Sequence, residues 1–254
     1  MNDDERQSIR NAFDYWSAQT DLVFLEVCSA AQADIVILWA AGNHGDGNNF
    51  DGPAPTGAIL AHGYFPPPTA AGILAGDIHF DEDETWTTAT RVSNSQPVDL
   101  QTVAAHEIGH SLGLNHTFVA GSLMLPSYTG SHRFLGSDEI AGIRSIYGAP
   151  GSNNGNNLIN GLTTLCLNSG TTYSVPNPPT GVVFTWSSSN TALATINPST
   201  GAAISIASGT VTFTATATSG CGSVPLSKRV TIGTPLTPRL NASGPLSPAC
   251  WNAT

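Results

Sequence analysis

The sequence predicts two folded units of different class: an α+β domain over residues 1–148 and a small all-β sandwich over residues 158–234. In the first part, segments with helical spacing alternate with short apolar runs, whereas the second part is dense in Thr, Val and Ser. Residues 149–157 are rich in Gly and Asn and are typical of a flexible linker. We expect residues 235–254 to be a linker or the truncated start of a further module.

The α+β domain is predicted to contain three helices. Residues 5–18 place apolar side chains at helical spacing and are the first helix. Asp99 is the expected N-cap of the second helix. The third helix is expected from Ser137 to Tyr147, followed by Gly148 as the residue that ends it. Apolar runs between the helices predict strands. These runs are residues 22–27, 34–40, 57–65 and 73–80.

The second helix carries the pattern H-E-x-x-H-x-x-G-x-x-H, which begins at His106. Residues four apart share a helix face, so His106 and His110 can bind one zinc ion. Gly113 can end the helix and let the chain turn back to present His116 as a third ligand. Three protein ligands leave one position open, which is typical of a catalytic zinc, and Glu107 is the expected general base.

This pattern is that of the metzincin metalloproteases, and the sequence resembles their matrixin branch, the matrix-metalloprotease family. Thr117 follows the third histidine, Met124 resembles the family's Met-turn, and Pro126-Ser127-Tyr128 resembles its Pro-x-Tyr wall segment. The resemblance implies a zinc endopeptidase with a mixed twisted sheet and three helices. The family places a strand before the first helix, and we expect this strand to be missing from the present sequence.

The resemblance also implies further metal ions and a substrate site. A structural zinc would be held by His44, Asp46, His62 and His79; one calcium by Asp51, Gly52, Asp81 and Glu84; and a second calcium by Asp34 and Asp77. Leu60 and Ala61 would pair with the substrate backbone, and Pro126, Ser127 and Tyr128 would wall the pocket for the side chain after the cut. Of seven histidines only His132 is left over, and we expect it at the surface.

The composition is that expected of an extracellular protein. A net charge of −10 and a pI of about 4.8 make nucleic acid an unsuitable partner. No apolar run reaches the roughly 20 residues that a membrane span needs. No signal peptide is present, so we expect a protein that is secreted or at the cell surface and whose N-terminus is missing from this sequence.

Residues 158–234 resemble bacterial immunoglobulin-like modules, which implies a spacer or a binding role toward extracellular matrix or a surface ligand. The expected strands are residues 171–175, 182–186, 202–207, 210–218 and 228–232. We expect a disulfide between Cys166 and Cys221; the alternative is two buried thiols. Cys28 and Cys250 are left unassigned.

A competing hypothesis is an adhesin or substrate-binding protein in which the protease domain is inactive or truncated. An inactive relic is expected to lose Glu107 or a histidine first, and all four residues are present. The sequence therefore favours an active protease that cleaves proteins or peptides.

Overall fold

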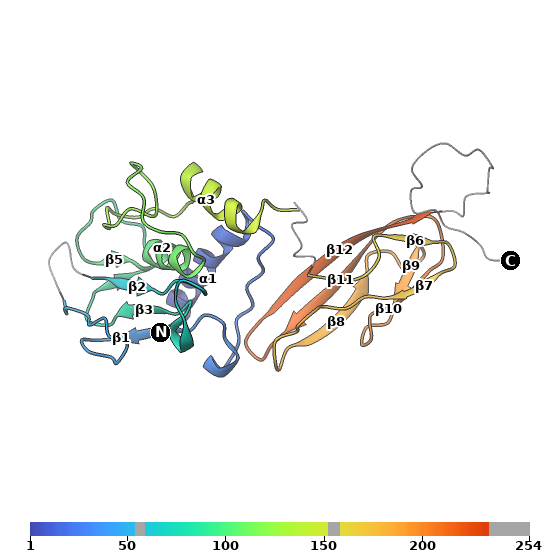
Figure 1. The fold of residues 1–254 in the computed structure, drawn as a ribbon, viewed down its shortest axis with the longest axis horizontal. Coiled ribbons are helices and arrows are strands. Elements are labelled where there is room, and N and C mark those ends of the chain that lie inside the picture. Colours follow the sequence, from blue (N-terminus) through green and yellow to red (C-terminus); the bar gives the residue numbers. More distant parts are fainter. Residues whose placement is uncertain (54–58, 152–157, 234–254) are drawn as a thin grey trace. The chain divides into compact units, whose positions relative to one another are not determined.

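The computed structural model describes residues 1–53, 59–151 and 158–233. Figure 1 labels their helices and strands. Most of the expected linker at 149–157, and the C-terminal segment at 235–254, lie outside the described residues. Within the described chain, no helix is both long and apolar enough to cross a membrane.

The chain divides into two compact units. The first consists of Met1–Phe24 and Ala33–Asn154, and the second of Leu25–Gln32 and Gly155–Thr254. The short segment Leu25–Gln32 therefore groups with the C-terminal part of the chain, which the sequence did not indicate. The domain boundaries expected at 148 and 158 otherwise stay a prediction.

Helix α1 (Asp3–Ser17) confirms the first expected helix and begins two residues earlier than expected. Its start is set by Asn2, whose side chain accepts a hydrogen bond from the Glu5 N–H at 2.9 Å while the Glu5 carboxylate accepts one from the Asn2 N–H at 2.7 Å. Its buried face is apolar and includes Trp16, whose Nε1–H donates to the Ala105 carbonyl at 3.0 Å. This bond joins α1 to the next helix.

A three-stranded mixed sheet supports the first unit. The fully buried strand β3 (Ile78–Asp81) pairs in parallel with β1 (Ile37–Ala40) and antiparallel with β2 (Ala61–Gly63), which leaves β2 at an edge. Two short strands, β4 (Trp86–Thr87) and β5 (Val98–Asp99), pair separately, and two 3₁₀ turns lie at Ala30–Gln32 and Gly72–Leu74.

The strand expected at residues 22–27 is wrong. Leu22 and Phe24 pack on the core of the first unit, but the segment Leu25–Gln32 belongs to the second unit. An apolar run fits any half-buried surface, so its composition does not show which neighbour it will meet.

Helices α2 (Leu100–Ser111) and α3 (Ser137–Tyr147) confirm the other two expected helices. Helix α2 contacts β2, β3 and α1, and almost all of its residues are buried. The core around it includes Ile78, Leu100, Ile108 and Ile143, each with no exposed surface. The sheet and the three helices together give the mixed α+β domain that the sequence predicts.

The second unit is all-β and has two sheets. One has the strand order β6-β12-β11-β8 and the other β7-β10-β9. Trp186 on β8, Phe213 on β11 and Ala203 on β10 belong to one buried cluster, so the two sheets share a core. The strands are β6 (Thr164–Cys166), β7 (Gly170–Thr172), β8 (Val183–Ser188), β9 (Ala194–Ile196), β10 (Ala202–Ser205), β11 (Gly209–Thr218) and β12 (Ser223–Gly233).

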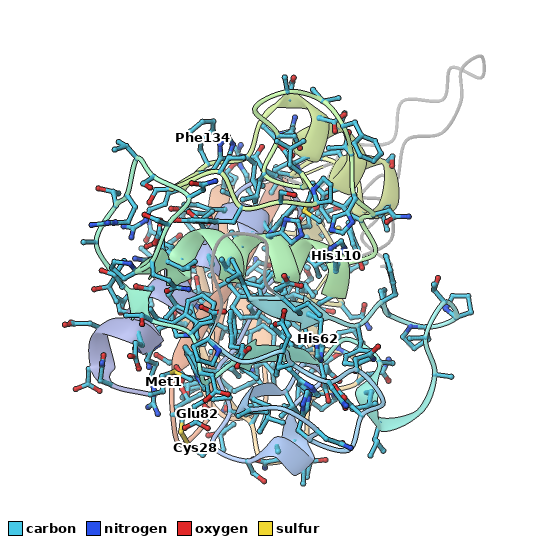
Figure 2. The ribbon with its side chains drawn as sticks, turned by 90° about the vertical axis from the view of Figure 1, so that its left-hand side faces the viewer. Met1, Cys28, His62, Glu82, His110 and Phe134 are labelled. Atoms are coloured by element: carbon cyan, nitrogen blue, oxygen red, sulfur yellow. A yellow bond between two sulfur atoms is a disulfide. The ribbon has the colours of Figure 1, made fainter. Side chains whose placement is uncertain are left out.

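The disulfide expected between Cys166 and Cys221 is wrong, because Cys221 is bonded to Cys28. Cys166 is also disulfide-bonded. The segment that carries Cys28 lies against the second unit, where the Ser219 hydroxyl donates to the Glu26 carbonyl at 2.6 Å. Cys28 is labelled in Figure 2. The two cysteines are 193 residues apart in the sequence, so cysteine spacing alone could not predict that they are bonded.

Candidate active site and metal-binding groups

Helix α2 begins and ends where the sequence predicts. The Asp99 carboxylate accepts a hydrogen bond from the Gln101 N–H at 3.2 Å and so caps the first turn. After the helix, Gly113 adopts a φ of 100°, a conformation that favours glycine, and the Leu114 N–H donates to the Gly109 carbonyl at 2.9 Å. This turn reverses the chain.

The turn brings three imidazoles to one point. The Nε2 atoms of His106 and His110 lie 3.1 Å apart, and each lies 3.2 Å from the Nε2 atom of His116. Nitrogen ligands of a tetrahedral zinc, at about 2.0–2.1 Å from the ion, are about 3.3 Å from one another. The three histidines therefore fit a zinc ion.

The protonation of two of these rings is set by backbone carbonyls. The Nδ1 atom of His106 lies 2.8 Å from the Leu123 oxygen, and that of His110 lies 2.8 Å from the Leu114 oxygen. A carbonyl can only accept, so each Nδ1 carries the proton and each Nε2 presents a lone pair to the shared point. Burial lowers the pKa of His106 to about 4 and also lowers the pKa of His110 and His116, which favours the neutral, metal-binding form.

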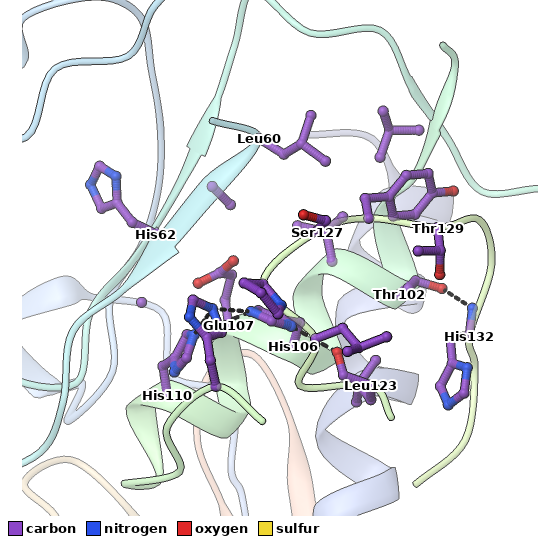
Figure 3. Close-up of a pocket in the computed structure, with 18 of the residues that line it drawn as sticks. Leu60, His62, Thr102, His106, Glu107, His110, Leu123, Ser127, Thr129 and His132 are labelled. Carbon is purple, nitrogen blue, oxygen red and sulfur yellow. Dashed lines mark hydrogen bonds between the residues drawn. The ribbon is translucent and has the colours of Figure 1, made fainter. Parts of the chain in front are cut away.

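The carboxyl of Glu107 lies beside the histidines, and Figure 3 shows it between them and strand β2. Burial raises its pKa to about 8, and a hydrogen bond from the Gly63 N–H opposes the shift. A carboxyl that titrates near neutral pH can both accept and return a proton.

Gly63 is a residue that the sequence analysis missed. A Cβ atom at this position would lie 2.6 Å from the Glu107 carbonyl oxygen and 3.2 Å from its Oε2. Only glycine lets β2 approach α2 this closely. Its place directly after His62 gives no signal of this contact, because the contact is between segments far apart in the chain.

Met124 lies under the active-site helix. A Cβ atom at Gly109 would lie 2.5 Å from the Met124 Sδ and 3.0 Å from the Trp16 ring, so Gly109 makes room for both. The Glu139 carboxylate accepts hydrogen bonds from the Ser122 hydroxyl and, at 3.2 Å, from the Met124 N–H. Burial tends to raise the pKa of Glu139, but these bonds outweigh it and lower the pKa. The sequence indicated Glu139 only as part of a helix start.

A cleft of about 780 Å³ runs along the histidines and Glu107. The expected substrate-site residues Leu60, Ala61, Pro126, Ser127 and Tyr128 all line it. In Figure 3, Leu60 and Ser127 border the space above Glu107. The Leu60 carbonyl accepts from the Asp81 N–H at 2.9 Å, so by alternation the peptide groups of Ala61 point away from the sheet.

A second group of metal-type side chains lies around strands β2 and β3. The Asp46 Oδ2 lies 2.7 Å from His44 Nε2, 2.8 Å from His62 Nε2 and 2.9 Å from His79 Nδ1. One ligand atom from each residue falls within 4.8 Å of all the others. Three nitrogens and one carboxylate oxygen around one point fit a closed tetrahedral zinc site. Figure 2 labels one histidine of each group: His62 lies on β2 and His110 on α2, and these two elements contact each other.

Two aromatic residues that the sequence did not indicate support this group. The Tyr64 hydroxyl donates to the Asp46 Oδ2 at 2.6 Å, and the Phe50 ring stacks on His44 at 4.8 Å and on His62 at 4.7 Å between ring centroids. Burial tends to raise the pKa of Asp46, but hydrogen bonds from Tyr64 and others outweigh it and lower the pKa. Asp46 is therefore ionised, as a zinc ligand must be.

The residues expected to hold calcium lie near one another. Asp81 has no exposed surface, and its Oδ2 has no hydrogen-bond partner among the described residues. Burial raises the pKa of Asp81, and the charges of Asp83 and Asp51 add to the shift, while a hydrogen bond from the Gly52 N–H opposes it. Glu84 is buried as well and accepts from the Gln96 amide. A buried carboxylate oxygen without a partner fits a cation.

The pair expected at the second calcium also lies close together. A Cβ atom added at Gly76, directly before Asp77, would lie 3.3 Å from the Asp34 carbonyl oxygen. The Asp77 carboxylate is buried and accepts from the Val36 N–H at 2.9 Å. The expectation for His132, in contrast, is wrong: this residue is half-buried, lines the cleft, and has a buried Nε2 with no partner in the described part of the chain.

Comparisons with known proteins agree with this geometry. Karilysin from Tannerella forsythia is 46% identical over 198 residues, which cover 78% of this chain and 38% of karilysin. The interstitial collagenase of Bos taurus is 50% identical over 146 residues, 57% of this chain and 28% of the collagenase. Stromelysin-3 of Mus musculus is 46% identical over 146 residues, 57% of this chain and 27% of that protein.

This chain thus spans less than two fifths of the length of these relatives. The karilysin match is longer than the first 148 residues, so it extends into the second unit. The matrixin family profile matches residues 1–148. The chain belongs to the matrixin family of metzincin metalloproteases.

Proposed function

We propose that this protein is a secreted, zinc-dependent endopeptidase. The observation that carries the proposal is the set of three Nε2 atoms at 3.1–3.2 Å from one another beside the buried carboxyl of Glu107, on the floor of an open cleft. A zinc ion bound there supplies Lewis acidity, which polarises the scissile carbonyl and lowers the pKa of water.

Glu107 is the general base and then the general acid. It takes a proton from the attacking water and passes it to the nitrogen of the leaving amine, a contribution of roughly 10²–10⁴-fold. Its pKa of about 8 supports both directions of transfer near neutral pH. The carbonyls of Leu123 and Leu114 hold His106 and His110 in the orientation that directs their lone pairs to the metal.

The substrate binds as an extended strand along β2. Ala61 has outward-facing peptide groups at the sheet edge, which can pair with a peptide backbone. Pro126, Ser127 and Tyr128 wall the pocket for the side chain that follows the cut.

The other metal groups stabilise the fold around the cleft. His44, Asp46, His62 and His79 hold a structural zinc, and Asp51, Gly52, Asp81 and Glu84 hold a calcium ion, with a second calcium at Asp34 and Asp77. The mutual distances of the first set support the structural zinc, and the Asp81 Oδ2, which has no hydrogen-bond partner among the described residues, supports the first calcium. The second unit is an immunoglobulin-like module that binds extracellular matrix or a surface ligand; its two-sheet core supports this reading.

The test uses the full chain and casein or gelatin as substrate. We expect cleavage that is lost with a zinc chelator and restored by added zinc, and a Glu107→Gln variant that still binds zinc but cleaves at least a hundredfold more slowly. Cleavage that survives chelation would refute the proposal. A zinc-loaded chain that cleaves neither protein would favour the binding-protein hypothesis instead.

A further inference from the structure

One wall of the cleft is built from two loops. Residues 88–97 contribute Asn94 and Gln96 to its lining, and residues 126–133 contribute Ser127, Tyr128 and their neighbours. The loops pair with each other where the Ser131 N–H donates to the Arg91 carbonyl at 2.7 Å and the Arg91 N–H donates to the Ser131 hydroxyl at 2.6 Å. Each loop is otherwise a stretch of chain with little regular structure of its own.

Arg133 joins both loops to the active-site helix. Its Nε and Nη2 donate to the two oxygens of Asp99 at 2.8 and 2.6 Å, and Nη2 also donates to the Thr88 carbonyl at 2.7 Å. A two-pronged contact of this kind sets direction as well as distance, which a single charged contact does not. Thr88 lies at the start of one loop, and Arg133 at the end of the other.

Asp99, the residue that Arg133 contacts, is fully buried and caps α2. The Tyr128 hydroxyl, from the wall itself, accepts from the Asp99 N–H at 3.1 Å. The Thr102 hydroxyl donates to Asp99 at 2.8 Å and accepts from the His132 N–H at 2.8 Å, a contact drawn in Figure 3. The wall is therefore fixed to the same helix that carries His106 and His110.

We propose that Arg133 is a positioning residue that sets the shape of the pocket for the substrate side chain after the cut. The inference rests on the proposed function. A wall that is held in place converts a difference in side-chain size into a difference in transition-state binding, whereas a loose wall adapts to either side chain. Arg133 itself contacts no substrate; it acts through Tyr128, Ser127 and the facing loop.

The test compares Arg133→Met and Arg133→Lys with a matched control, Arg144→Met. Arg144 lies on α3, and in the described part of the chain its side chain donates to the carbonyl and the side chain of Gln19, so its loss removes one arginine without touching the wall. Two peptides that differ only in Leu or Ala after the cut are assayed with each zinc-loaded protein. We expect Arg133→Met to lower the Leu-to-Ala ratio of kcat/KM by about tenfold, mainly through KM for the Leu peptide, with partial rescue by lysine and no change in the control.

A fall of equal size for both peptides would overturn the inference, because it would mean general destabilisation. Hydrogen exchange provides a readout without activity: in Arg133→Met, exchange should become faster in residues 88–97 and 126–133 but not in α3. Unchanged exchange in both loops would also overturn it. If the wild-type chain cleaves neither peptide, the proposed function fails and this inference fails with it, whereas an active wild type with an unchanged ratio refutes the inference alone.

Discussion

Replacing Gly63 with alanine should separate strand β2 from helix α2. The new Cβ atom would lie 2.6 Å from the Glu107 carbonyl oxygen, about 0.8 Å short of the 3.4 Å at which ordinary contact begins. The obstacle is backbone, so one of the two elements must move. Overpacking of this kind costs roughly 1–3 kcal/mol.

The displacement should also reduce catalysis. The new Cβ atom pushes against Glu107, the proposed general base. A shift of about 1 Å in a catalytic group can lower the rate by roughly 10²-fold. We therefore expect Gly63→Ala to lower both the free energy of unfolding and kcat/KM, while the zinc content stays that of the parent, because the ligands of both proposed zinc sites are unchanged.

The assay is urea unfolding together with peptide turnover and metal analysis. Gly233→Ala is the matched control, since a Cβ atom there meets nothing within 4 Å. We expect it to change stability by less than about 0.5 kcal/mol and to leave turnover unchanged. If Gly63→Ala matches this control in both measurements, the close approach of β2 to α2 does not exist in the protein.

Three further predictions concern other parts of the molecule. Burial raises the pKa of Glu107 from 4.5 to about 8, so the chelated wild type should lose stability as pH rises through this range, and the chelated Glu107→Gln variant should not. A difference in urea midpoint between variant and wild type that is the same at pH 5 and at pH 8 would contradict this prediction. His62→Ala should remove one zinc per chain and lower Tm, whereas Asp81→Asn should leave zinc unchanged and weaken stabilisation by added calcium, which metal analysis and thermal melts can separate. Cys28→Ser opens a loop that spans 193 residues, worth roughly 5 kcal/mol in the chain-entropy model. If the chain is then cut within residues 149–157, the two fragments of the variant should separate on a non-reducing gel, whereas those of the parent should stay joined.

The zinc-binding helix could be predicted from the sequence because its determinants are local. The cap at Asp99, the spacing of His106 and His110 and the turn at Gly113 all lie in one continuous stretch of chain, and helical geometry converts that spacing into a shared face. The histidines of the second group are distant in sequence, and only the resemblance to matrixins indicated that they belong together.

The disulfide shows where spacing fails. Cys166 and Cys221 lie in the same β-rich region, so pairing them was the simplest reading, yet Cys221 is bonded to Cys28. The segment Leu25–Gln32 had no feature of composition that assigned it to the second unit. The apolar run at 22–27 is likewise compatible both with a strand and with the irregular segment that the structure has there.

The sequence by itself determined the family and the three helices, and it indicated the residues that we propose as zinc ligands and general base, because each depends on residues that are close along the chain or on a motif with fixed offsets. Only the tertiary structure decided how β2 approaches α2 at Gly63, how Glu139 holds Met124, and how Arg133 fastens the cleft wall to Asp99. The residues in these contacts are separated by between 15 and 44 positions in the sequence. Close packing selects such partners by shape and by unsatisfied hydrogen bonds, and neither property can be read from the order of residues.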